Sequence, residues 1–310
     1  RDSFGDNRVA INRVERLAQT DLPILISGPT GSGKSTLAKY LHEISPRSGG
    51  VFRIQGCGEF TESTLQATLF GHVAGAYTDA RTNKPGLIRN CQSGTLVLED
   101  IDSLSPDSQR ALLSFLDDKS VAPIGDDEQR VQTDVRLIAT TNADLLADID
   151  ASRFRSDLYY RLSTASVMLP GFDTGDARLT ALVRVHSDRL RSQYGDLLSP
   201  ARFDESAIQL FSVHDWPGNH RELEAAILQV LMFMGPEHRN AVSASDIVRA
   251  LSDPTVTSPL RHAISHRARS SDTCVRKTLI ALRWNITWTA NFLQFSRQSI
   301  YNKIEKNGWL

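Results

Sequence analysis

Short apolar runs alternate with longer amphipathic segments along the first 170 residues of the chain. The apolar runs predict strands at Ile24 to Ser27, Val51 to Ile54, Thr95 to Leu98, Val135 to Thr140 and Ala165 to Leu169. Strands that alternate with helices are typical of a parallel sheet covered by helices. Ligands of such folds bind beyond the carboxyl ends of the strands, where polar residues follow several of these runs.

The pattern changes after Pro170, where strand signals stop and helical spacing dominates, as in Leu179-x-x-Leu182-Val183. Pro254, Pro259 and several serines then mark a linker. We therefore expect four segments: an α/β domain at residues 1–170, a small helical domain at 171–253, a linker at 254–272 and a C-terminal helical domain at 273–310.

The composition is that of an ordinary globular protein, with 310 residues, 40% apolar and 23% charged. No apolar stretch approaches the roughly 20 residues of a membrane span, and the start lacks the apolar core of a signal peptide. Because the chain does not begin with Met, we expect it to be a fragment. Three distant cysteines without metal-ligand spacing predict buried free thiols in the reducing cytoplasm: Cys57, Cys91 and Cys274.

Charge is distributed unevenly along the chain, whose net charge is −1. Residues 261–310 hold nine Lys/Arg against Asp272 and Glu305, so this segment is +7 and the rest is −8. A basic tail on an acidic body predicts contact with nucleic acid at the C-terminus. A solvated basic face with no partner is the alternative.

A glycine-rich loop directly follows the first predicted strand and matches the pattern G-x-x-x-x-G-K-[ST]. In such a loop, backbone N–H groups surround a phosphate, Lys34 neutralises the outer phosphates and the Ser35 hydroxyl binds magnesium. A helix that begins at residues 32–34 directs its positive end at the same phosphates. The alternative is a chance glycine-rich turn. The predicted ATP-binding residues are Gly28, Pro29, Thr30, Gly31, Ser32, Gly33, Lys34, Ser35 and Thr36.

A second acidic signal lies at the end of the third predicted strand, where Glu99 and Asp100 follow an apolar run. In phosphate-loop enzymes such a pair holds Mg²⁺ and polarises the attacking water. We assign Glu99 to the metal, together with Ser35, and Asp100 to the water. A solvated pair at a strand end is the alternative.

These signals together resemble the AAA+ domain of bacterial enhancer-binding proteins, the activators of sigma-54 RNA polymerase, over almost the whole chain. The resemblance implies an α/β AAA+ P-loop NTPase fold with a parallel sheet, a helical lid and an all-α helix-turn-helix domain. It also implies a homo-oligomer, as a ring. The segment that resembles the family's GAFTGA loop, which touches the sigma factor, reads Gly75-Ala76-Tyr77-Thr78-Asp79-Ala80. Asp79 replaces a flexible Gly and adds a charge to this loop.

Three further matches carry residue roles that the resemblance implies. Thr141 and Asn142 resemble sensor I, where Asn142 can reach the γ-phosphate or the attacking water. Arg155 and Arg161 resemble arginine fingers, which would act on a neighbouring subunit's nucleotide; surface ion pairs are the alternative. Arg221 resembles the sensor II residue that reports nucleotide to the lid.

The chain departs from the family at the acid pair, at Gly56 and at Asp79, which in the family link ATP hydrolysis to the partner loop. The acid pair is reversed, which moves the presumed base by about 1 Å and can cost on the order of a hundredfold in rate. Gly56 stands where the family places an Asn that restrains the catalytic Glu, and the stretch at residues 169–176 also differs. We therefore expect ATP binding with weak or altered hydrolysis.

The C-terminal segment resembles a Fis-type helix-turn-helix, with helices at about 287 to 294 and 297 to 306; a plain helical hairpin is the alternative. Ser296 is predicted to cap the second helix. Ala290, Leu293, Ile300 and Ile304 are predicted to pack the angle between the helices, and Trp288 and Tyr301 to be core. The predicted contacts with double-stranded DNA are Arg297, Gln298, Ser299, Asn302 and Lys303.

Three hypotheses follow for the function. The leading one is a cytoplasmic transcription regulator that binds DNA, assembles through its AAA+ domain and uses ATP to remodel sigma-54 polymerase. The second is a DNA-binding regulator whose AAA+ domain is a nucleotide-dependent oligomerisation module with little hydrolysis and no sigma-54 contact. The third, an ATPase that remodels another protein, is disfavoured by the basic C-terminal segment.

Overall fold

The chain forms two compact units in a computed structural model. We call residues 6–171 the sheet unit and residues 172–310 the helical unit. Each unit is described by itself. The structure describes residues 8–59, 61–76, 80–126, 128, 130–172, 176–214, 216–252, 272–293 and 295–309.

The sheet unit contains a five-stranded sheet in which every neighbouring pair is parallel. The order is β2-β5-β8-β1-β9, so the chain crosses over between strands. The predicted runs are confirmed to within one or two residues at each end. The central strands β5 and β8 are almost entirely buried, as strands covered on both faces are. The strands are β1 (Ile24–Ser27), β2 (Phe52–Gly56), β5 (Thr95–Glu99), β8 (Arg136–Thr141) and β9 (Ala165–Met168).

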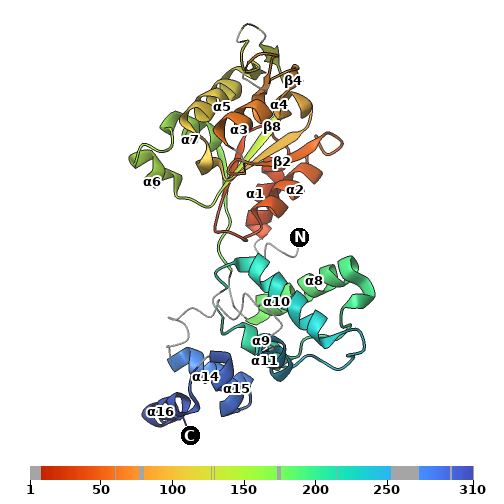
Figure 1. The fold of residues 1–310 in the computed structure, drawn as a ribbon, viewed down its shortest axis with the longest axis vertical. Coiled ribbons are helices and arrows are strands. Elements are labelled where there is room, and N and C mark those ends of the chain that lie inside the picture. The colour runs from red at the N-terminus through yellow and green to blue at the C-terminus, as the bar shows by residue number, and fades with distance from the viewer. Residues whose placement is uncertain are drawn as a thin grey trace. The chain divides into compact units, whose positions relative to one another are not determined.

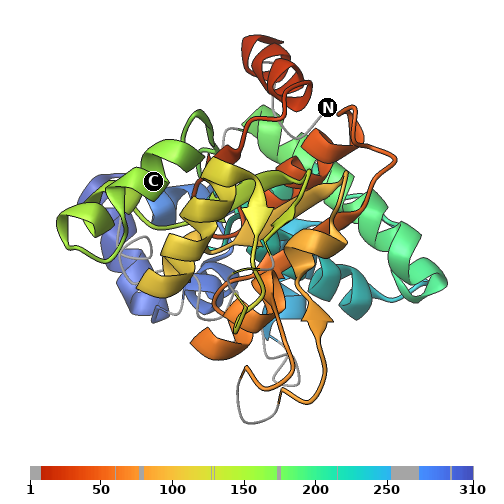
Figure 2. The same ribbon diagram turned by 90° about the horizontal axis from the view of Figure 1, so that it is seen from above.

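Helices cover both faces of this sheet (Figures 1 and 2). Leu96 and Leu98 of β5 point into a core formed with α3, α4, α5 and α7. Thr95 points to the opposite face and contacts α2 through His42. The helices are α1 (Arg8–Ala18), α2 (Lys34–Glu43), α3 (Glu62–Phe70), α4 (Leu87–Asn90), α5 (Pro106–Asp118), α6 (Leu145–Asp150) and α7 (Ser156–Leu162).

Two short antiparallel pairs and a 3-10 turn complete the sheet unit. Strands β3 and β4 pair with each other, as do β6 and β7. The 3-10 turn η2 directly follows β5 and its acidic end. The bounds are β3 (Gly71–His72), β4 (Lys84–Pro85), β6 (Ser120–Val121), β7 (Val131–Gln132) and η2 (Ile101–Ser103).

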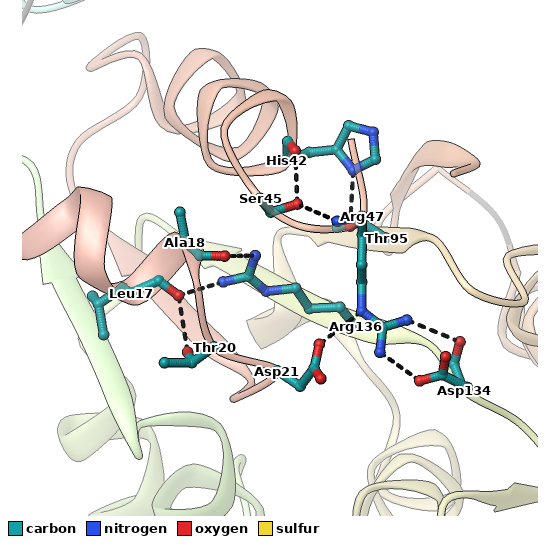
Figure 3. A network of polar contacts seen from close by, with 10 residues as sticks. All are labelled: Leu17, Ala18, Thr20, Asp21, His42, Ser45, Arg47, Thr95, Asp134 and Arg136. Carbon is teal, nitrogen blue, oxygen red and sulfur yellow. Dashed lines mark hydrogen bonds and ion pairs between the residues drawn. The ribbon is translucent and has the colours of Figure 1, made fainter. Parts of the chain in front are cut away.

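A polar network fixes the end of α1 to the sheet (Figure 3). Arg136 begins β8 with 1% of its surface exposed, and its guanidinium donates to the carbonyls of Leu17 (2.7 Å) and Ala18 (3.0 Å). These are C-terminal carbonyls of α1, which have no partner inside the helix. Arg47 extends the network by binding Asp21 and Asp134.

Two apolar clusters lie among the described residues of the helical unit. The first joins α8, α9, α10 and α11 and includes Ala281 and Leu282 at the end of α14. The second joins α14, α15 and α16 and includes Val213, which follows α9. The helices are α8 (Asp176–Tyr194), η3 (Gly195–Leu197), α9 (Glu205–Phe211), α10 (Asn219–Met234), α11 (Ala244–Ser252), α14 (Asp272–Ala281), α15 (Ile286–Leu293) and α16 (Arg297–Asn307).

Several predictions for the last two helices are confirmed. Ser296 caps α16 by accepting a hydrogen bond from the Ser299 N–H at 3.1 Å. The four residues predicted to fill the angle between α15 and α16 lie in one buried cluster: Ala290, Leu293, Ile300 and Ile304.

The prediction that Trp288 and Tyr301 are core residues is wrong. They are 38% and 49% exposed, respectively. Smaller apolar side chains already fill the space between the helices, so the large rings lie outside it. The three cysteines are free and buried, as predicted. No helix among the described residues is long and apolar enough to cross a bilayer.

Candidate functional site

The glycine-rich loop lies between β1 and α2, at the carboxyl edge of the sheet. Gly33 caps α2 with φ of 94°, a left-handed conformation that favours glycine, and α2 begins at Lys34 as predicted. Gly28 has φ of 152°, and a Cβ there would lie 2.5 Å from the Leu169 carbonyl oxygen. The loop therefore needs glycine at both positions, for conformation and for close approach.

Lys34 and Ser35 bring charge and a hydroxyl to this loop. The Lys34 ammonium donates to the carbonyls of Gly28 (2.8 Å) and Pro29 (3.1 Å), so it lies over the loop itself. The Ser35 hydroxyl donates to the Glu99 carboxylate, which belongs to the carboxyl end of β5. The glycine-rich loop and the acidic end of β5 thus meet, because β1 and β5 are parallel and their carboxyl ends lie at the same edge of the sheet.

The Ser35–Glu99 contact fits a magnesium ion. Mg²⁺ takes oxygen ligands, usually one or two from the protein with water and phosphate oxygens for the rest. No group of three His, Cys, Asp or Glu among the described residues could hold a metal alone. A hydroxyl and one carboxylate beside a phosphate loop are sufficient for an ion that arrives with a nucleotide.

Asp100 and Asp102 face different environments after β5. Asp100 is exposed and has φ of 53°, a left-handed conformation that is uncommon for a residue with a Cβ. Asp102, in η2, is half-buried, and its Oδ1 accepts a hydrogen bond from the Thr141 hydroxyl at 2.5 Å. The sequence analysis missed Asp102. Its signal was a third carboxylate close after the acid pair.

The sensor-like residues at the end of β8 contact the glycine-rich loop. The Asn142 amide donates to the Thr30 hydroxyl at 3.2 Å, and the Gly28 N–H donates to the Thr141 carbonyl at 3.2 Å. Strand β8 lies between β5 and β1, which brings its end next to both. The glycine-rich loop, the acid pair and the sensor-like residues therefore lie together at the carboxyl edge of the sheet.

Glu59 fills the space beside Gly56. A Cβ on Gly56 would lie 2.7 Å from the Glu59 carboxyl carbon, so an Asn side chain could enter only if Glu59 moved. The neighbouring Cys57 is 2% exposed, and burial, with Asp100 as the next cause, raises the pKa of its thiol to about 12. The Glu59 side chain therefore occupies the space that the Asn expected here from the sequence resemblance would need.

Arg155 is half-buried and Arg161 is exposed on the sheet unit, and each forms an ion pair. Arg155 precedes α7 and pairs with Asp157 at 2.7 Å, whereas Arg161 pairs with Asp117 of α5 at 2.6 Å. Their described partners are these aspartates and not the glycine-rich loop. Both surface pairs are open to water, where such contacts are weak and exchangeable.

Arg221 lies in the first turn of α10, in the helical unit, and is exposed. Buried contacts brace the segment around it. Glu222 binds the His214 ring at 2.8 Å and the Gly218 N–H at 2.8 Å, and the Trp216 indole donates to the Phe211 carbonyl. Arg221 thus projects from a braced turn.

The base of the predicted partner loop is closed by hydrogen bonds. The Gly75 N–H donates to the Ala80 carbonyl at 2.7 Å, and the Ala74 N–H donates to the Asn83 side chain at 2.7 Å. Ala76 is also described, whereas Tyr77, Thr78 and Asp79 lie outside the described residues.

The predicted DNA-contacting residues of α16 fall into two groups. Arg297, Gln298 and Asn302 are exposed, and the Gln298 amide donates to the Asn302 carbonyl oxygen at 3.0 Å. Ser299 is half-buried at the cap, and Lys303 forms an ion pair with Asp272 of α14 at 2.6 Å. Lys303 therefore helps join α16 to α14.

The fold and site define a class of protein. A parallel five-stranded sheet, a phosphate loop before a helix, an acidic strand end and a helical second unit are those of an AAA+ P-loop NTPase fold.

Comparisons with known proteins give the family. The Sigma-54 interaction domain model matches residues 5–168 and the AAA+ ATPase lid domain model matches residues 179–263. The chain therefore belongs to the sigma-54-dependent transcriptional activator family.

Individual relatives agree with this family. The hydrogenase transcriptional regulatory protein HoxA of Cupriavidus necator is 32% identical over 94% of this chain and 62% of its own length. The response regulator FleR of Pseudomonas aeruginosa is 36% identical over 73% of this chain and 47% of its own length. NtrX from Brucella abortus, crystallised with ATP, superposes with a TM-score of 0.70 and 26% identity over 97% of this chain and 69% of that chain. The chain thus spans about half to three-fifths of the length of these two curated relatives.

Proposed function

We propose that this chain binds ATP with Mg²⁺ and is the AAA+ and DNA-binding part of a transcription regulator that acts on sigma-54 RNA polymerase in the cytoplasm. The contact between Ser35 and Glu99, beside Lys34, carries the nucleotide part of the proposal. It joins the two groups that a P-loop NTPase uses to hold the metal of a bound nucleotide. Family membership and the NtrX likeness support the same ligand.

We further propose that hydrolysis is slow. Asp100 occupies the presumed base position with a side chain one methylene shorter than Glu, on backbone in the left-handed region. A base displaced by about 1 Å loses on the order of a hundredfold in rate, whereas nucleotide binding depends on the loop and changes little.

Steady-state ATP hydrolysis over a range of protein concentration tests this pair of claims. We expect the wild type to bind ATP with low turnover, and the Glu99→Asp/Asp100→Glu variant to turn over faster. Lys34→Ala should abolish binding, with Lys39→Ala, an exposed lysine of the same helix, as its control. Fast turnover in the wild type that rises with concentration would refute slow hydrolysis. Absent ATP binding would refute the function as a whole.

A second candidate is a regulator whose nucleotide site drives assembly without productive hydrolysis or sigma-54 contact. The exposed Asp100 and the charged Asp79 in the partner loop favour it. Two measurements separate the candidates. The first is the size of the assembly with ATP, with ADP and without nucleotide, and the second is sigma-54 binding by the wild type and by an Asp79→Gly variant. If ATP assembles the wild type and only Asp79→Gly binds sigma-54, the second candidate is correct. If the wild type already binds sigma-54, the first is.

We also propose that the chain assembles into a homo-oligomeric ring, in which Arg155 and Arg161 would leave their aspartates and act on a neighbour's nucleotide. Their side chains are 40% and 53% exposed, and such a role requires access to solvent. Mixing Arg161→Ala subunits that bind ATP with Lys34→Ala subunits that do not should restore some hydrolysis, because the arginine and the nucleotide would then come from different chains. No restoration in mixed assemblies would contradict a role in trans.

DNA binding is proposed for the exposed side of α16, on the basic charge of the segment and the cap and packing of its two helices. Affinity for promoter DNA should fall steeply with salt, because bound cations are released from phosphates. Arg297→Ala and Asn302→Ala should weaken binding, whereas Lys39→Ala in the sheet unit should not. Equal binding by all three variants would refute the assignment.

A further inference from the structure

Asp102 has a contact that no family motif assigns to it. It lies two residues after Asp100, in the 3-10 turn η2, and its carboxylate accepts the hydroxyl of Thr141 at 2.5 Å, 39 residues away in the chain. The turn is held by Ile101, which is fully buried. The left-handed backbone at Asp100 turns the chain after β5, so that the next carboxylate faces β8 instead of the loop.

Thr141 is locked by its partners. It ends β8 with 1% exposure, its hydroxyl donates to Asp102, and the same oxygen accepts the Ala143 N–H at 3.0 Å. Its carbonyl accepts the Gly28 N–H at 3.2 Å. Donor and acceptor capacity of the hydroxyl are thus both used, which fixes the side chain and the backbone on either side of Asn142.

Asn142, held between these anchors, points its amide at Thr30 of the glycine-rich loop, 3.2 Å away. A continuous series of contacts therefore runs from Asp102 through Thr141 and Asn142 to the loop. The contact between Asp102 and Thr141 is the first of this series, so its loss would loosen the contacts that follow.

We propose that Asp102 is a positioning residue for ATP recognition: through Thr141 it holds Asn142 at the place of the terminal phosphate. The inference rests on the proposed nucleotide function. It predicts that Asp102 acts as a hydrogen-bond acceptor for Thr141, with no direct contact to metal or nucleotide. Loss of this acceptor should weaken discrimination for the third phosphate and leave ADP affinity intact, because the backbone N–H groups of the loop hold the first two phosphates.

Matched variants separate positioning from a direct charge effect. Asp102→Asn retains an acceptor oxygen of the same shape without the charge, whereas Asp102→Ala removes it. Thr141→Ser keeps the hydroxyl, whereas Thr141→Val removes it with nearly the same shape. Asp107→Ala, which breaks an exposed pair with Arg110 on α5, is the control for a lost carboxylate nearby in sequence.

The experiment is competition of a non-hydrolysable ATP analogue and of ADP against a fluorescent ADP, with Mg²⁺, on the full chain. The readout is the ratio of the dissociation constant for ADP to that for the ATP analogue, which measures the preference for the third phosphate. We expect the ratio to fall about tenfold in Asp102→Ala and Thr141→Val, a change of about 1.4 kcal/mol. It should stay within about threefold of the wild type in Asp102→Asn, Thr141→Ser and Asp107→Ala. The Asp102→Ala/Thr141→Val double variant should be no worse than either single one.

Three outcomes overturn the inference. The first is a ratio unchanged in Thr141→Val, which is the variant least expected to disturb folding. The second is a loss in Asp102→Asn as large as in Asp102→Ala, which would mean that the charge itself acts on the ligand. The third is additive loss in the double variant. A wild type that binds neither nucleotide would instead refute the proposed function, and this inference with it.

Discussion

Arg136 joins a helix end to the sheet through a single buried side chain (Figure 3). Its removal would leave the Ala18 carbonyl without this donor, whereas the Leu17 carbonyl would keep the Thr20 N–H and hydroxyl as donors. Because an unsatisfied buried group costs about 1–3 kcal/mol, we expect Arg136→Met to lower the free energy of unfolding by about 1–3 kcal/mol, measured in urea, and to speed hydrogen exchange in α1. Arg130→Met removes an exposed pair with Asp118 and should cost less than about 1 kcal/mol. Equal costs for the two variants would contradict the role of burial.

Single residues differ in how well the sequence predicts them. Gly33 and Ser296 were predictable because a left-handed cap and a side-chain cap are local requirements of the helices that follow. Asp102 was not, because its partner is 39 residues away and the contact depends on the turn at Asp100. Lys303 was predicted to meet DNA, yet α14 supplies an aspartate that no local pattern relates to it.

Helix α16 presents a face that differs from the expected one, because Tyr301 lies outside and Lys303 is paired. Tyr301 is on the exposed side with Gln298 and Asn302. We expect Tyr301→Ala to weaken DNA binding by about 1 kcal/mol or more, through lost apolar contact in a groove. Lys303→Ala should lower the midpoint of thermal unfolding more than it lowers DNA affinity. Gel-shift titration and thermal unfolding of both variants measure this, and the opposite pattern would restore the sequence-based assignment.

Histidines on α8 and α10 meet inside the helical unit. His186 Nε2 lies 3.3 Å from His220 Nδ1, with Glu224 and Arg189 facing them. Burial, the largest cause, lowers the pKa of both rings below 6.5, against the charge of Glu224. The unfolded chain therefore takes up protons here at a higher pH than the folded chain does. The contribution of this pair to the free energy of unfolding should be fully present above pH 6.5 and should decrease as the pH falls below that value.

Urea unfolding at about pH 7.5 and pH 6.0 measures this dependence. The His186→Gln/His220→Gln variant should lose less stability than the wild type over the same interval. His42, whose pKa burial also lowers, remains in both proteins and sets the residual slope of the sheet unit. A variant with the same pH dependence as the wild type would exclude this pair as a cause.

Elements were predictable where the hydrophobic pattern alone determines them. The central strands β5 and β8 are buried on both faces around apolar runs, and the order of strands and helices followed from alternation. Strand order in the sheet was not predictable, because it depends on crossovers that leave no local mark in the sequence. The constellation at the loop followed only from the rule that carboxyl ends of parallel strands share an edge.

At the scale of the whole molecule, the C-terminal helices are joined to the lid. Residues 171–253 and 273–310 were predicted as two segments joined by a linker, and residues 172–310 form one compact unit in the structure. Val213 of the lid belongs to the cluster of α14, α15 and α16, and Ala281 and Leu282 belong to the cluster of the lid. A linker pattern in the sequence shows only where chain composition changes, and says nothing about which apolar faces meet afterwards.

This packing has a consequence for deletion of residues 272–310. The truncated chain would uncover Val213 and the lid surface that Ala281 and Leu282 cover, and each fully buried apolar side chain contributes about 1.5–3 kcal/mol. We expect the lid to lose about 2–5 kcal/mol, to bind a hydrophobic dye and to unfold at lower urea. Asn302→Ala changes the exposed side of α16 without uncovering the lid, so it should keep wild-type stability. Because deletion removes both the proposed DNA face and the support of the lid, a defect in nucleotide response after deletion would not by itself assign that response to DNA contact. A truncated chain with wild-type stability and no dye binding would show that the two parts are energetically independent.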